Sequence, residues 1–181
     1  MIVARIYYPV TTLGYGKRVG IWVAGCEKNC KNCMSETLKA SNAGIFMSVD
    51  DICKTVRRAG EHIDGITISG GEPFLQIEEL TALTERLSEE FTDDIIIFTG
   101  YTLEQLDKKH TEYLRRIINS VSVIIDGEYV EALNDGVGIR GSSNQRVHIF
   151  KNAERHECLN YQKRSVQIIE HRKGMTVIGI P

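Results

Sequence analysis

Three cysteines, Cys26, Cys30 and Cys33, fall within eight residues near the start of the chain. Their spacing is CxxxCxxC, and the apolar run Val19–Gly25 leads directly into it. Three thiolates on one short loop can hold three corners of an iron–sulfur cube and leave the fourth iron free to bind a substrate. A site with four cysteines saturates its cluster and only carries electrons. The three-cysteine pattern therefore points to an enzyme.

Two other uses of these cysteines have to be weighed against a cluster. Structural zinc takes four ligands, usually arranged as two pairs, but the remaining cysteines, Cys53 and Cys158, each stand alone. A disulfide framework does not suit five cysteines in a chain that shows nothing resembling a secretory signal. The spacing of the cysteines favours a cluster, but the spacing alone does not exclude zinc.

A second informative segment is Ser69-Gly70-Gly71-Glu72-Pro73, which lies between an expected strand and an expected helix. Paired glycines allow close backbone approach, a proline suits the first helical turn, and Glu72 supplies a carboxylate. Ligands of parallel α/β folds bind at the carboxyl ends of strands, where this segment lies. Taken alone, the segment also suits a tight strand–helix turn with a capping glutamate.

Size and composition describe an ordinary globular protein. The 181 residues are 42% apolar and 25% charged, which predicts a single domain spanning residues 1–181. A net charge of −2 gives no electrostatic basis for binding nucleic acid or a membrane surface. The basic clusters Lys151–Arg155 and Arg172-Lys173 are interpreted as solvated faces. Clustered, reduced cysteines without a targeting segment indicate the cytoplasm.

Strands alternate with helices along the chain. The expected strands are short and rich in Ile and Val: Val19–Ala24, Gly65–Ser69, Ile95–Thr99, Val121–Asp126, Val147–Phe150 and Val166–Glu170. The expected helices have caps or apolar stripes: from Ser48 to Gly60, over Leu75–Phe91, from Thr102 onward, and over Tyr113–Ile118. This order predicts an α/β fold with mostly parallel strands. A complete (β/α)₈ barrel needs at least roughly 200 residues, so we expect a partial barrel of about six strands, open on one side.

The three cysteines followed by Gly-Gly-Glu-Pro at the end of the next strand resemble the radical S-adenosylmethionine (SAM) superfamily. The resemblance implies a partial (β/α)₆-type radical SAM barrel in which the cysteines hold a [4Fe–4S] cluster. SAM would chelate the fourth iron. Gly70, Gly71 and Glu72 would contact the SAM amino group, a contact that suits a carboxylate and backbone carbonyls.

Further segments of the sequence resemble one particular family within this superfamily. Phe98–Leu106, Ile125–Tyr129 and Arg140–Gln145, with the loop Gly14–Arg18, are similar to the activating enzymes of anaerobic (class III) ribonucleotide reductases. The match covers the chain from about residue 14 to residue 150. It implies reductive cleavage of SAM, a glycyl radical generated on the partner reductase, and reduced flavodoxin as the electron donor. The open barrel side would admit the glycine loop of the partner.

The same resemblance suggests more site residues. Thr99 and Asp126 end strands on the cluster rim and are expected SAM or active-site contacts. Many radical SAM proteins have an aromatic residue before the third cysteine, whereas this chain has Asn32, so the adenine contact must come partly from elsewhere. Met34 is a candidate for that contact or for simple packing. The Arg140–Gln145 loop meets SAM or the partner, or forms an ordinary surface turn.

Alternatives remain at this point. A small radical SAM enzyme acting on another peptide or metabolite would share the cluster and the Gly-Gly-Glu residues. A zinc-binding or electron-transfer module is the non-enzymatic alternative. His148 lies in an expected strand and could point into the site. The tail after Lys151 could complete the sheet edge or dock the partner.

Overall fold

The computed structural model describes residues 1–60, 62–171 and 174–181, and only the backbone of His171. The basic pair Arg172-Lys173 therefore lies outside the described residues. The strands are β1 Ile2–Val10, β2 Arg18–Val23, β3 Ile45–Phe46, β4 Gly65–Gly70, β5 Ile95–Phe98, β6 Val123–Asp126, β7 Arg146–Ile149, β8 Val166–His171 and β9 Gly174–Gly179. The α-helices are α1 Val49–Ala59, α2 Ile77–Glu90, α3 Leu103–Ser120 and α4 Ala153–His156.

Seven strands form one open sheet in the order β3-β1-β2-β4-β5-β6-β7. The central strands β2, β4, β5 and β6 pair in parallel. Antiparallel strands flank them, β1 and β3 on one side and β7 on the other. The expected α/β class with a mostly parallel, open sheet is confirmed. The sixth expected strand, Val166–Glu170, corresponds to β8, which forms a separate two-stranded sheet with β9.

The long strand β1 was not expected from the sequence. Pro9 lies near its end, and a proline inside an apolar run argues against a regular strand because it cannot donate to a ladder. The register between β1 and β2 shifts between Tyr7 and Val10, around this proline. The irregularity lets the strand accommodate a residue that would be excluded from a regular central position.

The helices begin where their capping residues predict. The Ser48 hydroxyl accepts a 3.1 Å hydrogen bond from the Asp51 amide at the start of α1. Thr102 and Gln105 form a reciprocal capping box at the start of α3, which satisfies two backbone N–H groups that the helix leaves free. The expected segment Tyr113–Ile118 is the second half of this helix, beyond a kink at His110.

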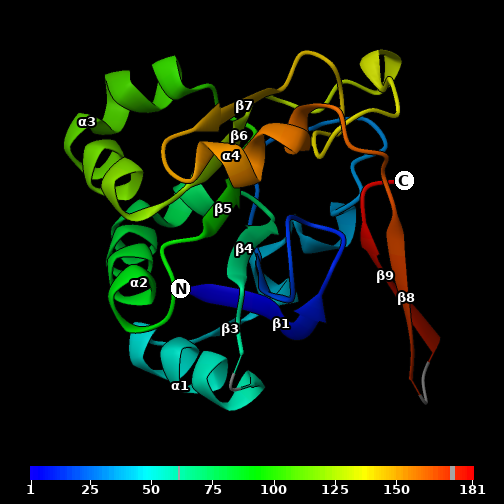
Figure 1. The fold of residues 1–181 in the computed structure, drawn as a ribbon. Helices are drawn as coiled ribbons and strands as arrows, with labels where there is room; N and C mark the ends of the chain where they lie inside the picture. The colour runs from blue at the N-terminus through cyan, green and yellow to red at the C-terminus, as the bar shows by residue number, and fades with distance from the viewer. Residues whose placement is uncertain (61, 172–173) are drawn as a thin grey trace.

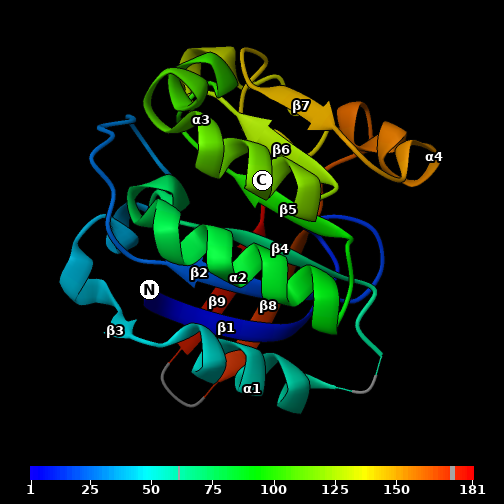
Figure 2. The same ribbon diagram turned by 90° about the vertical axis from the view of Figure 1, so that its left-hand side faces the viewer.

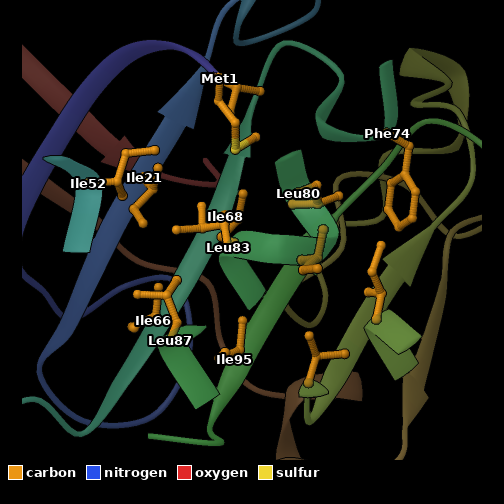
Figure 3. Packing of buried hydrophobic residues seen from close by; sticks show 14 of the residues in the cluster. Met1, Ile21, Ile52, Ile66, Ile68, Phe74, Leu80, Leu83, Leu87 and Ile95 are labelled. Carbon is orange, nitrogen blue, oxygen red and sulfur yellow. The ribbon is translucent and has the colours of Figure 1, made fainter. Parts of the chain in front are cut away.

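The main hydrophobic core lies between one face of the sheet and the helices (Figure 1). Alternate strand residues such as Ile21 and Ile68 point to this face, because successive side chains of a strand alternate. Figure 3 shows them packed against Leu80, Leu83 and Ile52 from α2 and α1. This packing fixes the sheet whose ends carry the predicted motifs.

The opposite face of the sheet is covered by the end of the chain. Trp22 and Phe98 point to this face and pack with Ile178 and Ile180 at the end of the β8–β9 hairpin. Figures 1 and 2 place the hairpin on the side of the sheet away from α1 and α2. The tail therefore lies across a face of the sheet and does not extend its edge.

A buried ionic network joins the amino ends of the central strands. The fully buried Arg18 donates to Thr67 Oγ1 at 2.8 Å and to Asp94 Oδ1 at 2.9 Å. Arg155 and His156, in α4, also reach Asp94, at 3.2 and 3.3 Å. Burial favours a raised pKa of Asp94, but the His156 contact and the Arg18 charge outweigh it and lower the pKa to about 2. No helix within the described ranges is long and apolar enough to cross a membrane.

Candidate functional site

A cavity of about 620 Å³ opens at the carboxyl ends of the parallel strands. It lies between the cysteine loop, the segments that follow β4, β5 and β6, and the strand β9. This is the edge of a parallel sheet at which α/β proteins bind ligands. Eight of the nine expected site residues line the cavity: Cys26, Cys30, Asn32, Cys33, Gly70, Gly71, Glu72 and Thr99. The ninth, Asp126, lies outside the lining.

The cysteines lie on a closed loop that follows β2. The Gly25 and Cys26 amides donate 2.9 Å hydrogen bonds to the carbonyls of Leu38 and Lys39, which joins the two ends of the loop. All three thiols are free and half-buried. Burial raises the pKa of Cys26, and the nearby charge of Glu72 adds to the effect. A bound cation would reverse this effect, since metals bind thiolates.

The donor set fits an iron–sulfur cluster with three protein ligands. A cube of four irons takes thiolates at separate corners, whereas a single zinc ion gathers them around one point. In the part of the chain that the structure describes, no three His, Cys, Asp or Glu side chains are gathered to hold a single metal ion. The three thiols instead line one cavity from positions spread along the loop.

Tyr101, which follows β5, anchors the cysteine loop on one side. Its hydroxyl donates a hydrogen bond to the Glu27 carboxylate, and Lys28 Nζ lies 4.3 Å from its ring centroid. Burial, reinforced by the negative charge of Glu27, raises the pKa of Tyr101. Tyr101 falls inside the resemblance segment Phe98–Leu106, but its link to the cysteine loop was not predicted. Glu27 lies 74 positions from Tyr101 in the sequence, so no local sequence pattern indicates the link.

The acidic residue Glu131, after β6, holds the loop on the other side. Lys31 Nζ lies 3.3 Å from Glu131 Oε2, and the Asn32 amide donates to the same carboxylate. Asn32 has a φ of 54°, a left-handed conformation that asparagine tolerates better than most residues. The geometry thus gives Asn32 a role in shaping the turn before Cys33.

The paired glycines bring the second motif against the start of the cysteine loop. The Gly71 amide donates to the Val23 carbonyl at 2.8 Å, and the Glu72 amide to the Gly25 carbonyl at 2.7 Å. A Cβ on Gly71 would lie 2.3 Å from the Gly25 carbonyl oxygen. Gly70 has a φ of 109°, which also disfavours any side chain. The two motifs therefore form one continuous backbone unit.

The Glu72 carboxylate is buried beside the cavity. Its Oε1 accepts from the Thr99 hydroxyl at 2.8 Å and from the Phe74 amide at 3.0 Å. Its Oε2 accepts from the Gly100 amide at 2.7 Å. Burial raises the pKa of Glu72, against the effect of these donors. Glu72 thus caps the turn after β4, as the structural reading of the motif suggests, and also borders the cavity.

Asp126 is fully buried and turned toward a different set of partners. Arg146 forms two hydrogen bonds to its carboxylate, at 3.0 and 2.6 Å, and the Leu103 amide donates at 2.7 Å. His148 Nε2 lies 3.1 Å from the same carboxylate, so this histidine faces Asp126. These contacts tie β6 and β7 to the start of α3.

The Arg140–Gln145 segment contributes residues near both ends of its loop to the cavity. Gly141 and Gln145 line the cavity. Gln145 Oε1 accepts from the Gly141 amide at 2.7 Å, and its Nε2 donates to the Gly127 carbonyl at 2.7 Å. Gln145 therefore fixes this loop against the segment that follows β6. Met34 also lines the cavity, and its side chain is 55% exposed.

Comparison with known proteins agrees with this geometry. Residues 12–148, more than half of the chain, match the family model described as a 4Fe-4S single cluster domain. A Haemophilus influenzae protein is 33% identical over 153 residues, covering 80% of this chain and 96% of that protein. A protein of Enterobacteria phage T4 is 35% identical, covering 79% and 90%. Both are named anaerobic ribonucleoside-triphosphate reductase-activating protein.

The chain belongs to this family of reductase-activating proteins. An Escherichia coli (strain K12) protein of the same name is 31% identical over 78% of this chain and 95% of its own length. Membership of a 4Fe-4S family favours an iron–sulfur cluster over zinc as the metal centre of this chain. The model match ends at residue 148, so the β8–β9 hairpin lies beyond it.

Proposed function

We propose that this chain binds a [4Fe–4S] cluster and SAM in the 620 Å³ cavity and generates a glycyl radical on an anaerobic ribonucleotide reductase. One observation carries the proposal: the three free thiols and the Gly-Gly-Glu segment line the same cavity, joined by backbone hydrogen bonds. The names of the relatives point to the reductase as partner, in preference to another peptide or metabolite.

In this proposal, residues of the chain bind the cluster and SAM and orient them. Cys26, Cys30 and Cys33 would supply three thiolates to the cluster. The backbone of Gly70 and Gly71 and the carboxylate of Glu72 would face the amino group of SAM, with Thr99 and Asn32 as neighbours. Asp126 acts indirectly in this proposal, because its carboxylate bonds Arg146 and the start of α3.

Once bound, the cluster and SAM would supply one-electron chemistry: the electron of the reduced cluster would cleave the SAM sulfonium, and a hydrogen atom would be taken from a glycine Cα. A primary-carbon radical attacks any C–H bond in reach, so positioning decides what reacts. The buried part of the cavity wall, including Glu72 and Thr99, would shield the cofactor from water, while the open side would admit a protein loop. A reduced flavodoxin-type protein is the electron donor we propose, and the cytoplasm, which keeps thiols reduced, is the compartment.

The test is SAM cleavage by anaerobically reconstituted protein with a strong reductant, run beside Cys30→Ala. We expect the wild-type protein to release 5′-deoxyadenosine and the variant to release none. Adding the reductase should then yield a glycyl radical signal in electron paramagnetic resonance (EPR) spectra. Iron binding without 5′-deoxyadenosine, with or without the reductase, would contradict SAM cleavage. SAM cleavage without a radical on the reductase would contradict the choice of partner.

A further inference from the structure

The β8–β9 hairpin has a mainly apolar face directed away from the sheet, and the exposed Glu170, opposite Met175, is the charged residue at one end of it. Val166, Ile168, Met175 and Val177 are 42%, 60%, 69% and 52% exposed. The register pairs Ile168 with Val177, and alternation along each strand places all four side chains on one face. We call these four residues the outer hairpin face. Contiguous exposed apolar side chains of this kind mark interaction sites.

The inner face of the hairpin is fixed to the rest of the protein. Ile169 and Ile178 pack there against residues of β1 and β2. The Thr12 hydroxyl donates to the Ile178 carbonyl at 3.1 Å, and Gln167 Nε2 donates to the Pro9 carbonyl at 2.9 Å. The outer hairpin face is therefore presented from a defined position, with its orientation set by the inner contacts.

The outer hairpin face continues into the wall of the candidate site. Met175 and Val177 line the same cavity as Cys26, Cys30 and Cys33. A hydrogen atom can be removed only from a group held within a few ångströms of the radical. A protein substrate must therefore insert a loop into this cavity, and the body of that protein must lie against the residues around the opening. The hairpin forms one side of that opening.

We propose that the outer hairpin face docks the anaerobic ribonucleotide reductase, through an apolar surface of the reductase next to its radical-forming glycine loop. The inference rests on the proposed function. The hairpin lies outside residues 12–148, which match the cluster family, and the described side chains of its strand β8 do not line the cavity, so substitutions on β8 can test docking apart from cluster assembly. Exposed apolar area next to a reaction cavity suits a partner that binds for each activation and then leaves, since a permanent partner would need a larger interface.

The test uses substitutions on β8, whose side chains Val166 and Ile168 do not line the cavity. Ile168→Asp places a charge on the outer hairpin face. The pair Val166→Thr with Ile168→Thr removes apolar surface but keeps branched side chains that suit a strand. The matched control is Ile45→Asp on β3, which changes a 69% exposed apolar residue outside the cavity lining.

Each reconstituted protein is titrated with the reductase, and the glycyl radical is measured by EPR. We expect Ile168→Asp to need on the order of tenfold more reductase for half-maximal radical, because a charge must be buried without a partner. The double threonine variant should shift the same way by less, and Ile45→Asp should match the wild type. Iron content and the change in the reduced cluster's EPR signal on adding SAM should stay at wild-type values in all variants.

Other outcomes overturn the proposal. Equal half-saturation in wild type and both hairpin variants would show that the face does not dock the reductase. Loss of the SAM-dependent signal together with the radical would show that the hairpin supports the site instead. A wild-type dimer that Ile168→Asp dissociates would assign the face to a second copy of this chain. Wild-type protein that yields no radical at any reductase concentration would contradict the proposed function itself.

Discussion

The hydroxyl of Thr99 donates a 2.8 Å hydrogen bond to Oε1 of Glu72. Thr99 follows β5 and Glu72 follows β4, so this bond joins the ends of two adjacent parallel strands at the edge of the cavity. Each residue was expected separately as a cofactor contact. The structure makes them one unit, in which Thr99 orients the carboxylate that would face SAM.

Thr99→Val should lower the free energy of unfolding by about 1–2 kcal/mol, because it removes a buried hydrogen bond to a carboxylate. The Tyr101 amide, which donates to Thr99 Oγ1 at 3.1 Å, would lose its acceptor as well. Urea unfolding measures the change. The exposed Thr11→Val is the control and should change little. Additive losses in Thr99→Val, Glu72→Gln and their double variant would contradict the coupling that this bond implies.

Cys33→Ala should lose most of the reconstituted iron, because two remaining thiolates cannot hold a cluster that needs three. Iron analysis and the absorbance of the reconstituted protein measure the loss. Cys158→Ala is the matched control, since that thiol is also free and half-buried but lies outside the loop. Equal iron in the wild-type protein and Cys33→Ala would remove this cysteine from the proposed ligands.

Asp94→Asn should lower the free energy of unfolding at pH 7 by roughly 3 kcal/mol, because it leaves the buried Arg18 charge without its counter-ion. The direction of the pH dependence of stability follows from the lowered pKa of Asp94. A carboxyl with a pKa of about 2 in the folded protein, against 3.8 ordinarily, adds stability above pH 4 that is lost as the pH falls toward 2. The neighbouring exposed Asp93→Asn is the control for urea unfolding at pH 7. Equal stability of the two variants would contradict the network.

Asn32→Val should reduce iron incorporation and stability, whereas Asn32→Gly should retain both. A β-branched residue in the left-handed region at φ 54° costs about 1–2 kcal/mol. Glycine adopts this conformation freely and loses only an exposed hydrogen bond to Glu131, which contributes less. Iron content and thermal unfolding distinguish the two variants. Iron loss in both variants would indicate that the side chain itself, and not its backbone, supports the site.

The parts of the fold set by local patterns were predictable from the sequence. Interactions between residues close together in the sequence determine the strands β2, β4, β5 and β6 and the helix caps at Ser48 and Thr102. The strand β1 and the position of the hairpin depend on distant pairing. Nothing near Ile178 indicates that it packs in the same cluster as Trp22, on the face of the sheet opposite the helices.

The convergence of the two motifs was also predictable, because adjacent parallel strands end at the same edge of a sheet. The position of a residue at the end of a strand does not determine the direction in which its side chain points. Asp126 was expected at the cavity from its place at the end of β6, but its carboxylate bonds Arg146 from β7. The contact of Lys28 with Tyr101 likewise depends on how the cysteine loop folds back.

The most direct test of glycyl radical formation is the transfer of deuterium from the reductase to SAM-derived product. The reductase is prepared with α-deuterated glycine and incubated anaerobically with the reconstituted protein, SAM and reductant. We predict 5′-deoxyadenosine that carries deuterium, together with a glycyl radical signal on the reductase, and neither with Cys30→Ala. Abundant 5′-deoxyadenosine without deuterium, and no radical on the reductase, would contradict the account.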